Sequence, residues 1–420
     1  MTTHSLQRDE FYMLQGPAQL RVTAGVVEII AARLGAGKEL RIPLGKRVPV
    51  KVLEDATLEI EAGPEGFAKM DVGSIPSEWD QLVTRILGER KEGSLYTVMV
   101  MGEVDTGKTF FSTYLANRLM DSLKRTAILD CDTGQSDIGP PGTFGMLVMK
   151  EPTVFLSEVT PTYLYMLGAH SPGLHFLPAL TGLDAMLVKA RNEADVLVID
   201  TTGWVQGDGG RAIKKAKLDI ARPDIVILMQ RGNELEHLVK HLPAKNVVRL
   251  PVSKKASPTS QMERKSLREH VSTVYFKDAK IIEIPFGQVF TDRAYFLTGT
   301  PVALEGTLHA EKLSGWEGTL VVSSGPLMPE MMKAWPDPKQ LGRIMNFCAG
   351  EEKGVMVGLL DAQQDVLAIG RLEELDFLKN VFRVRTPFKG KSESVKGVQF
   401  GSLKLTEKGE EAGFLEPGSI

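Results

Sequence analysis

The stretch GEVDTGKT at Gly102–Thr109 fits the phosphate-binding pattern G-x-x-x-x-G-K-[ST]. The apolar run TVMVM precedes it and the helical run TFFSTYLANRLMDSL follows it. In such a strand–loop–helix unit, backbone N–H groups and the helix N-terminus hold phosphate oxygens. Lys108 would reach the β- and γ-phosphates, and the Thr109 hydroxyl would ligate Mg²⁺. The predicted nucleotide contacts are Gly102, Glu103, Val104, Asp105, Thr106, Gly107, Lys108, Thr109 and Phe110.

Acidic residues end two of the strands that follow this loop. Asp130 and Asp132 are two apart, so they face the same side and can meet at the carboxyl edge of the sheet. One would hold Mg²⁺ or its water shell, and the other would accept a proton from an attacking hydroxyl. The structural alternative is that one of them only caps a turn. Asp200, at the end of another strand, suits a Walker-B-type position or a nucleotide-sensing switch.

Aromatic and basic residues further along could act on a bound substrate. Trp204 follows Gly203, where it either stacks on a base or belongs to the core. Arg264 and Arg268 fall on a helix predicted from Thr259 to about Tyr275, and their spacing of four places both on one face. Two guanidiniums there can neutralise a transferring phosphoryl group. The alternative is an ordinary surface helix. The polar stretch 253–258 before it would be the hinge of such a lid.

The pattern of apolar and turn residues divides the chain into four parts. Residues 1–76 alternate short apolar runs with turns, which predicts a small β-sandwich-like domain. Residues 77–91 predict a linker helix. From 92 to 285 strands alternate with helices, which predicts an α/β domain built on a doubly wound parallel P-loop sheet, with a lid. Residues 286–420 predict a small C-terminal β-rich domain.

Individual elements can be predicted from the same pattern. The central strands are expected at Tyr96–Met101, Thr126–Asp130, Val196–Asp200, Asp224–Met229 and Asn246–Val252. The helices between them are expected at Thr109–Leu123, Gly210–Ala221 and Asn233–His241. Strands flanking this region include Gln19–Val22, Gly25–Ala32, Val48–Leu53, Thr57–Ile60 and Tyr295–Leu297.

Composition excludes several classes of protein. The chain has 420 residues, 43% hydrophobic and 25% charged, so it can bury real cores and is not disordered. Two cysteines exclude a disulfide framework and favour a reducing compartment, which indicates the cytoplasm. No run approaches 18 apolar residues, so no membrane span is expected, and the first residues lack the apolar segment of a secretory signal.

Positive charge gathers in one part of the chain. Between Val205 and Arg268 there are 14 Lys and Arg against six Asp and Glu, a local balance of +8 in a chain of net charge −3. This predicts a basic face suited to a phosphodiester backbone. The alternative is a set of solvated helix faces. The basic residues include Arg211, Lys214, Lys215, Lys217, Lys245, Arg249, Lys254 and Lys255.

Three strings, taken with the P-loop, resemble one known family. DCDTGQS at 130–136, GPPGT at 139–143 and DTTGWVQG at 200–207 are similar to the polynucleotide 5′-hydroxyl kinases. That family includes the kinase subunit of the pre-mRNA cleavage and tRNA-splicing assemblies, its rRNA-processing relatives and archaeal homologues. The resemblance implies transfer of the γ-phosphate of ATP to the 5′-hydroxyl of RNA, with DNA as an alternative acceptor, in RNA processing or repair. It also implies ATP and Mg²⁺ as cofactors and RNA-processing proteins as partners.

The resemblance also assigns roles to single residues. Lys108 and Thr109 match the phosphate and magnesium residues, and Asp132 matches the carboxylate that orients or deprotonates the 5′-hydroxyl. Asp130 matches a nearby acidic position, and Asp200 departs from members that carry Asn there. The resemblance implies a metal set of Thr109, Asp130 and Asp132, catalytic roles for Lys108, Asp132, Arg264 and Arg268, and substrate contacts from Gln135, the clasp Thr160, Pro161 and Thr162, and the base-stacking Trp204.

Two rival functions share the phosphate-binding loop. The first is an ATP-binding scaffold of an RNA-processing complex that has no kinase activity. The second is a GTPase or a partitioning-type ATPase, which would hydrolyse nucleotide without a polynucleotide acceptor. A GTPase predicts a guanine-reading N/T-K-x-D string after the strand Asp224–Met229, where Gln230-Arg231-Gly232-Asn233 stands instead.

Overall fold

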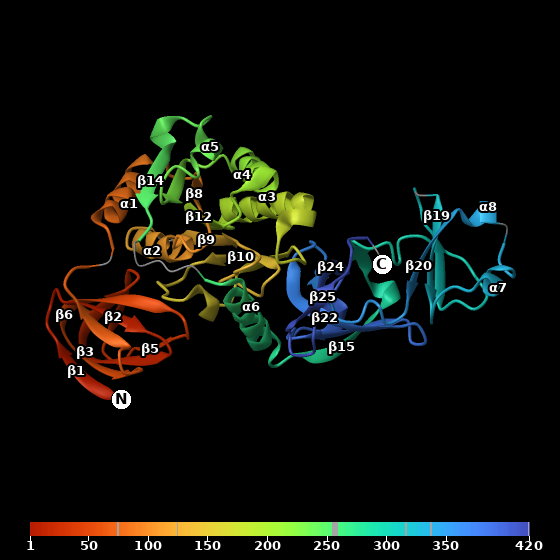
Figure 1. The fold of residues 1–420 in the computed structure, drawn as a ribbon, viewed down its shortest axis with the longest axis horizontal. Helices are drawn as coiled ribbons and strands as arrows, with labels where there is room; N and C mark the ends of the chain where they lie inside the picture. The colour runs from red at the N-terminus through yellow and green to blue at the C-terminus, as the bar shows by residue number, and fades with distance from the viewer. Residues whose placement is uncertain (74, 124, 254–258, 316, 337, 419) are drawn as a thin grey trace.

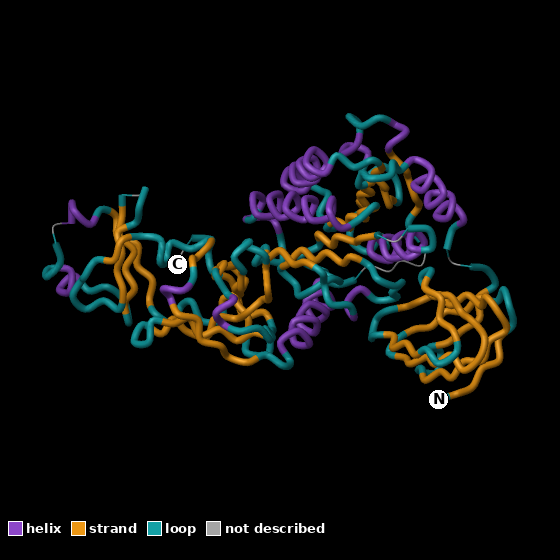
Figure 2. Tube along the Cα trace, turned by 180° about the vertical axis from the view of Figure 1, so that it is seen from behind, coloured by secondary structure: helices purple, strands orange, loops and turns teal. Residues whose placement is uncertain are grey.

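The computed structural model describes residues 1–420 except 74, 124, 254–258, 316, 337 and 419. The strands of these residues form a seven-stranded N-terminal sheet, a seven-stranded central sheet, and two C-terminal sheets of seven and four strands. The N-terminal and C-terminal sheets lie at opposite ends of the long axis, with the central sheet between them (Figure 1). Most of the helix belongs to the central part, as Figure 2 shows from behind.

The N-terminal sheet is antiparallel throughout, and two long strands organise it. β3 and β6 pair with each other over most of their length, and β6 alternates buried residues such as Val48 and Val50 with more exposed neighbours. Both strands were predicted as two shorter ones. Gly25 has φ 75° and lies at a register shift in β3, so a bulge gives the same sequence signal as a turn. The strands are β1 (Thr2–Leu6), β2 (Phe11–Gln15), β3 (Ala18–Ile29), β4 (Ala32–Gly35), β5 (Glu39–Ile42), β6 (Arg47–Glu61) and β7 (Phe67–Met70).

The central sheet has the order β11-β10-β9-β12-β8-β13-β14. The last five strands in this order are parallel, and β10 and β11 add two antiparallel strands at one edge. The strands are β8 (Tyr96–Gly102), β9 (Thr126–Cys131), β10 (Thr143–Val148), β11 (Tyr163–Met166), β12 (Val196–Thr201), β13 (Ile225–Gln230) and β14 (Val247–Pro251). The helices are α1 (Ser77–Glu89), α2 (Lys108–Met120), α3 (Phe176–Glu193), α4 (Gly207–Ala221), α5 (Glu236–Val239) and α6 (Gln261–Phe276).

Helices cover both faces of this sheet. Val98 and Val100 of β8 belong to the core that includes α1 and α2. Met99 and Met101 of the same strand belong to the core that includes α3 and α4. Alternate residues of one strand therefore enter two different cores, as a doubly wound sheet requires. This confirms the predicted fold class. The five predicted central strands are confirmed to within one residue at each end.

The N-terminal sheet packs directly on α2, the helix that begins in the phosphate-binding loop. Ile30 and Ala31 form the turn between β3 and β4; both have positive φ and both are buried. Asn117 of α2 donates its side-chain N–H to the Ile30 carbonyl at 2.6 Å. Next to it, Arg118 makes two 2.8 Å hydrogen bonds to the buried Glu28 carboxylate of β3. The loop helix is therefore braced by the N-terminal sheet.

The C-terminal part contains a larger and a smaller sheet. Phe286, Phe296 and Phe382 pack edge-to-face in the core of the larger one. The predicted strand Tyr295–Leu297 is wrong: the segment is a turn in which Leu297 has φ 65°. The larger sheet contains β15 (Lys280–Pro285), β16 (Phe290–Asp292), β21 (Val355–Leu360), β22 (Val366–Asp376), β23 (Val381–Thr386), β24 (Gly397–Leu405) and β25 (Glu411–Phe414). The smaller one contains β17 (Thr300–Pro301), β18 (His309–Lys312), β19 (Gly318–Ser323) and β20 (Arg343–Cys348), with the short helices α7 (Pro329–Met332) and α8 (Pro338–Leu341) nearby in the chain.

The helix predictions for the central part were wrong at one place and incomplete at another. The helix expected at Asn233–His241 is the single turn α5, and the long helix α3 was not predicted at all. The domain boundaries proposed after residues 76, 91 and 285 stay predictions. Within the described residues, no helix is long and apolar enough to cross a membrane.

Candidate active site

The phosphate-binding loop joins β8 to α2 and has the backbone shape its sequence predicts. Gly107 has φ 86°, which glycine adopts without cost, and Asp105 has φ 59°. The Thr106 hydroxyl donates to the Glu103 carbonyl at 2.9 Å, which closes the loop. Lys108 is buried, and its Nζ also donates to the Glu103 carbonyl, at 2.8 Å. A bound phosphate would therefore have to take Lys108 from this carbonyl.

Thr109 and Asp200 form the pair best suited to Mg²⁺. The Thr109 hydroxyl donates to Asp200 Oδ2 at 2.6 Å, while Asp200 Oδ1 is buried and has no hydrogen-bond partner in the described part of the chain. Burial, opposed by Lys108 and Thr109 and reinforced by Asp132, raises the pKa of Asp200 to about 6. Hard oxygen ligands of this kind are what Mg²⁺ or its bound water requires. The residues present therefore fit the ion, and one of them, Asp200, was not in the predicted metal set.

Asp130 holds the loop that follows β9. Its Oδ1 accepts the Asp132 N–H at 2.8 Å, and its Oδ2 accepts the Asp137 N–H at 2.7 Å. Burial and the neighbouring Asp200 and Asp132 raise the pKa of Asp130 well above its ordinary value. These contacts match the structural alternative, in which this carboxylate organises a turn. A direct magnesium role for Asp130 stays a prediction.

Asp132 is the carboxylate presented at the carboxyl edge of the sheet. Its Oδ1 accepts the N–H groups of Gly134 and Gln135 at 3.0 and 3.1 Å, which orients the side chain. Its Oδ2 has no hydrogen-bond partner among the described residues, and the residue is only half-buried. The Gln135 amide donates to the Arg264 carbonyl at 3.2 Å. The turn that carries Asp132 is therefore connected to the lid helix.

The lid helix α6 starts with a capping box, in which Ser260 and Glu263 bond each other's backbone N–H groups. Thr259, which lies just before this helix, contacts the phosphate-binding loop. The Thr259 N–H and hydroxyl donate to the Asp105 carboxylate at 2.6 and 3.0 Å. Arg264 Nη1 lies 3.8 Å from the same carboxylate. The predicted hinge at 253–258 falls mainly outside the described residues, which omit 254–258.

Arg268 contacts the C-terminal sheet. Its Nε donates to Glu411 Oε1 of β25 at 2.7 Å. His170 Nδ1 lies 3.4 Å from the same oxygen. Arg264 and Arg268 share one face of α6 as predicted, but they meet different parts of the molecule.

Trp204 lies just before α4 and follows Gly203, where a Cβ would meet Val104 of the loop. Its ring centroid is 5.9 Å from that of Phe176, and the two planes are 31° apart. A Cβ on Gly209 would lie 2.6 Å from the indole, so this glycine allows the ring to pack on α4. Trp204 is half-buried, which leaves part of its surface for a base. The packing on Phe176 and α4 matches the core interpretation, and base stacking by Trp204 stays a prediction.

The predicted clasp is not brought to the carboxyl edge of the sheet. Thr160 and Thr162 are exposed, and Thr162 bonds β10 through Met146 and Val148. The register of β10 on β9 places Thr162 near the level of Ile128, which is about 13 Å along the strand from Asp132. Pro161 lies between the two threonines and is half-buried. The clasp assignment stays a prediction that needs a change of conformation.

Three comparisons place the chain among known proteins. Residues 102–278 match the family model described as mRNA cleavage and polyadenylation factor CLP1 P-loop. A polyribonucleotide 5′-hydroxyl-kinase of Thermococcus kodakarensis is 31% identical over 346 residues, which is 81% of this chain and 96% of the relative. The chain belongs to the polyribonucleotide 5′-hydroxyl-kinase family. A second member, from Methanocaldococcus jannaschii, is 29% identical over 337 residues, with 77% and 91% of the two chains covered.

A solved structure has the same fold as this family member. A chain of the wild-type Clp1p–Pcf11p complex superposes with a TM-score of 0.64 over 96% of this chain and 97% of that one. The identity is 13%, so this likeness shows the fold alone. It confirms a P-loop α/β fold with further β-rich parts. Membership in a P-loop kinase family also makes the chain an ATP-binding protein.

The predicted basic face of this kinase-family chain is wrong at two positions. Lys214 and Lys217 are completely buried between α4 and the sheet. Lys214 Nζ donates to the Thr202 carbonyl, and burial lowers its pKa well below the ordinary value. Lys217 Nζ lies 4.8 Å from the centre of the Phe144 ring. These ammonium groups are therefore unavailable to a phosphodiester, and Lys254 and Lys255 fall outside the described residues.

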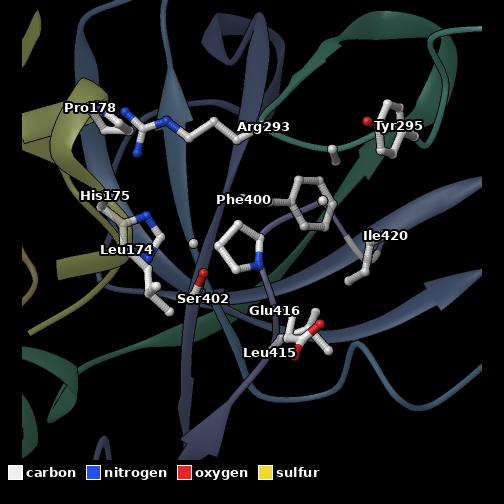
Figure 3. Close-up of a pocket in the computed structure, with 14 residues that line it drawn as sticks. Leu174, His175, Pro178, Arg293, Tyr295, Phe400, Ser402, Leu415, Glu416 and Ile420 are labelled. Atoms are coloured by element: carbon white, nitrogen blue, oxygen red, sulfur yellow. The ribbon is translucent and has the colours of Figure 1, made fainter. Parts of the chain in front are cut away.

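A cavity of about 450 Å³ lies apart from these residues, between the start of α3 and the C-terminal sheet. Figure 3 shows His175 and Arg293 at one side of it and Tyr295 and Phe400 at the other. The Arg293 guanidinium bonds the Met166 and Leu167 carbonyls. None of the predicted site residues lines this cavity.

Proposed function

We propose that this chain transfers the γ-phosphate of ATP to the 5′-hydroxyl of RNA. The observation that carries the proposal is the arrangement at the carboxyl edge of the central sheet. Thr109, at the end of the phosphate-binding loop, bonds Asp200 of β12. The turn that carries Asp132 follows β9, the strand next to β12. A phosphoryl donor and an acceptor hydroxyl could thus meet between a P-loop and a half-buried carboxylate. Membership in the polyribonucleotide 5′-hydroxyl-kinase family supports RNA as the acceptor.

In the proposed reaction, the 5′-oxygen of RNA forms a bond to the γ-phosphorus of ATP while the bond to the β–γ bridging oxygen breaks. ADP leaves, and Asp132 receives the proton of the hydroxyl. The Gly134 and Gln135 N–H groups fix one oxygen of this carboxylate, so the other can face the acceptor. Lys108 exchanges the Glu103 carbonyl for phosphate oxygens, and Arg264 neutralises charge from the lid. Positioning then supplies most of the catalysis.

Mg²⁺, when bound, would neutralise charge on the phosphates. Thr109 and Asp200 are the residues we propose to hold it, because the hydroxyl and the unpartnered Asp200 Oδ1 are oxygen ligands beside the loop. Asp132 is close enough to influence the pKa of Asp200, so it belongs to the same acidic group. Asp130 contributes by holding the Asp132 turn in place.

The wider setting of the reaction is also part of this proposal. We infer that 5′-hydroxyl RNA is the preferred acceptor, with DNA as a second substrate, and that RNA-processing proteins bind the chain. A cytoplasmic location is supported by the two free cysteines, Cys131 and Cys348, which suit a reducing compartment. Cell fractionation with an antibody would test the location directly.

The test is transfer of label from γ-labelled ATP to short 5′-hydroxyl oligonucleotides of RNA and DNA. Wild type is expected to label RNA, and Lys108→Ala and Asp132→Ala are expected to lose at least 100-fold in rate, as removal of a catalytic electrostatic or acid–base group typically does. Lys69→Ala is the matched control, because Lys69 is exposed on the N-terminal sheet, where it pairs with Glu10. Tight ATP binding without any transfer would refute the kinase and favour the scaffold.

A further inference from the structure

Arg268 is the point where the lid helix meets the C-terminal sheet. Arg268 and Glu411 are both mostly buried, with 18% and 17% of their side chains exposed. Of the guanidinium nitrogens, only Nε donates a hydrogen bond to the Glu411 carboxylate, at 2.7 Å. Within the described residues, neither terminal nitrogen of Arg268 has a hydrogen-bond partner. The contact therefore holds the guanidinium at Nε and leaves its two terminal nitrogens available.

Glu411 is itself held from two further directions. β25 pairs with β24, and the register sets Glu411 opposite Leu405, so its backbone is part of the sheet. His170 Nδ1 lies 3.4 Å from the Oε1 atom that Arg268 uses. Burial lowers the pKa of His170 to about 4, so the ring beside this carboxylate is neutral at pH 7. Glu411 is thus fixed through the backbone of the sheet and contacted by both Arg268 and His170.

The same junction reaches the turn that carries Asp132. A Cβ on Gly134 would lie 3.1 Å from the His170 carbonyl, so the segment that carries His170 packs on the turn that follows Asp132. Gln135 in this turn also bonds the Arg264 carbonyl of α6. The lid helix α6 and β25, from distant parts of the chain, therefore both lie close to the turn that carries Asp132. In Figure 1, α6 lies beside the C-terminal sheet that supplies β25.

We propose that Glu411 is a positioning residue for phosphoryl transfer: it holds Arg268 by Nε so that both terminal nitrogens face the phosphate groups when the lid closes. The inference rests on the proposed kinase function and gives the C-terminal sheet a role in it. A guanidinium held at its base is preorganised to bind two phosphate oxygens side by side. Without Glu411, Arg268 would have to be immobilised again in each catalytic cycle.

The opposite interpretation predicts the opposite result. If Glu411 only sequestered Arg268 from the phosphates, removal of the carboxylate would release the arginine and speed the reaction. If Glu411 only stabilised the sheet, its removal would lower the folded fraction without depending on Arg268. The sign of the change and its dependence on Arg268 therefore separate the three roles.

The experiment compares Glu411→Ala, Arg268→Ala and the double variant in the RNA-labelling assay with the full chain. We expect Glu411→Ala to lower kcat about tenfold or more, with the KM for RNA and the Kd for ATP within about twofold of wild type, because the loss concerns the transition state. The double variant should be no slower than Arg268→Ala, because Glu411 acts only through that arginine. Glu411→Gln keeps an acceptor oxygen and should recover most of the rate.

Glu373→Gln is the matched control. Glu373 is also a buried carboxylate of the C-terminal sheet, with 9% of its side chain exposed, and it pairs with Arg371 and Arg385 rather than with the lid. It should lose stability in a thermal melt but keep kcat per folded molecule. Normal or faster turnover by Glu411→Ala, or losses that add in the double variant, would overturn this inference while the kinase function stands. A wild type without RNA labelling would overturn both.

Discussion

Asp105 in the phosphate-binding loop anchors the beginning of the lid, and its removal should release the lid without disturbing the loop. The Asp105 carboxylate accepts the Thr259 N–H at 2.6 Å and the Thr259 hydroxyl at 3.0 Å. The backbone of Asp105 has φ 59°, which would strain most replacements. Glycine adopts this conformation freely, so Asp105→Gly removes the side chain and keeps the loop shape.

The size of the effect follows from these two bonds. A hydrogen bond to a charged acceptor contributes about 1.5 kcal/mol at the low end, so two would contribute about 3 kcal/mol. Asp105 is 23% exposed, and solvent screening reduces the sum to about 2 kcal/mol. At 1.36 kcal/mol for each factor of ten, the equilibrium for lid opening should shift about 30-fold toward the open state.

Hydrogen exchange followed by mass spectrometry measures this opening directly. Peptides from Gln261–Phe276 should exchange about 30-fold faster in Asp105→Gly, while peptides from the N-terminal sheet should not change. Asp105→Asn also tolerates positive φ and retains a neutral acceptor, so it should give an intermediate rate. Unchanged protection of α6 in Asp105→Gly would refute the idea that this carboxylate holds the lid.

Three further outcomes are expected. Thr109→Ala should lower kcat at least tenfold and weaken Mg²⁺-dependent ATP binding, measured by titration with and without the ion, whereas Thr109→Ser should retain most activity. Glu28→Gln leaves the guanidinium of Arg118 without its buried charge partner, so it should cost about 3 kcal/mol in urea unfolding; an unchanged midpoint would contradict this. The folded-state pKa of His170, about 4, lies below its unfolded value of 6.5, so the stability it supports is lost as pH falls from 6.5 toward 4. Between pH 7 and 5 this should amount to about 2 kcal/mol, and His170→Gln should show a correspondingly flatter dependence in unfolding at the two pH values.

The central strands could be predicted because burial on both faces leaves a simple signal. β8 and β12 are continuous apolar runs that end in a glycine-rich or acidic turn, and both matched closely. The helix α3 had a usable signal as well, since its buried residues Ala179, Leu183, Met186 and Ala190 recur at helical spacing. The long N-terminal strands could not be recognised as such, because bulges and exposed acidic pairs in a strand look like turns.

Site residues could be predicted only where a local sequence pattern determines the geometry by itself. The phosphate-binding loop carries its own geometry, so Lys108 and Thr109 lie where the spacing put them. Asp200 and Glu411 make contacts across the fold, and spacing alone does not reveal which partner each one meets. Lys214 and Lys217 were predicted wrongly for a different reason. Their charge suggested an exposed position, but both lie on the buried side of α4.

The buried turn at Ile30 and Ala31 has a consequence for synthesis on the ribosome. Its partner Asn117 lies 87 residues further along the chain. At roughly 5–20 residues per second, that partner is made about 4–17 s after the turn. During this interval an apolar hairpin tip that belongs in the interior lacks the helix that covers it. The N-terminal sheet therefore completes its packing only when the loop helix has been made.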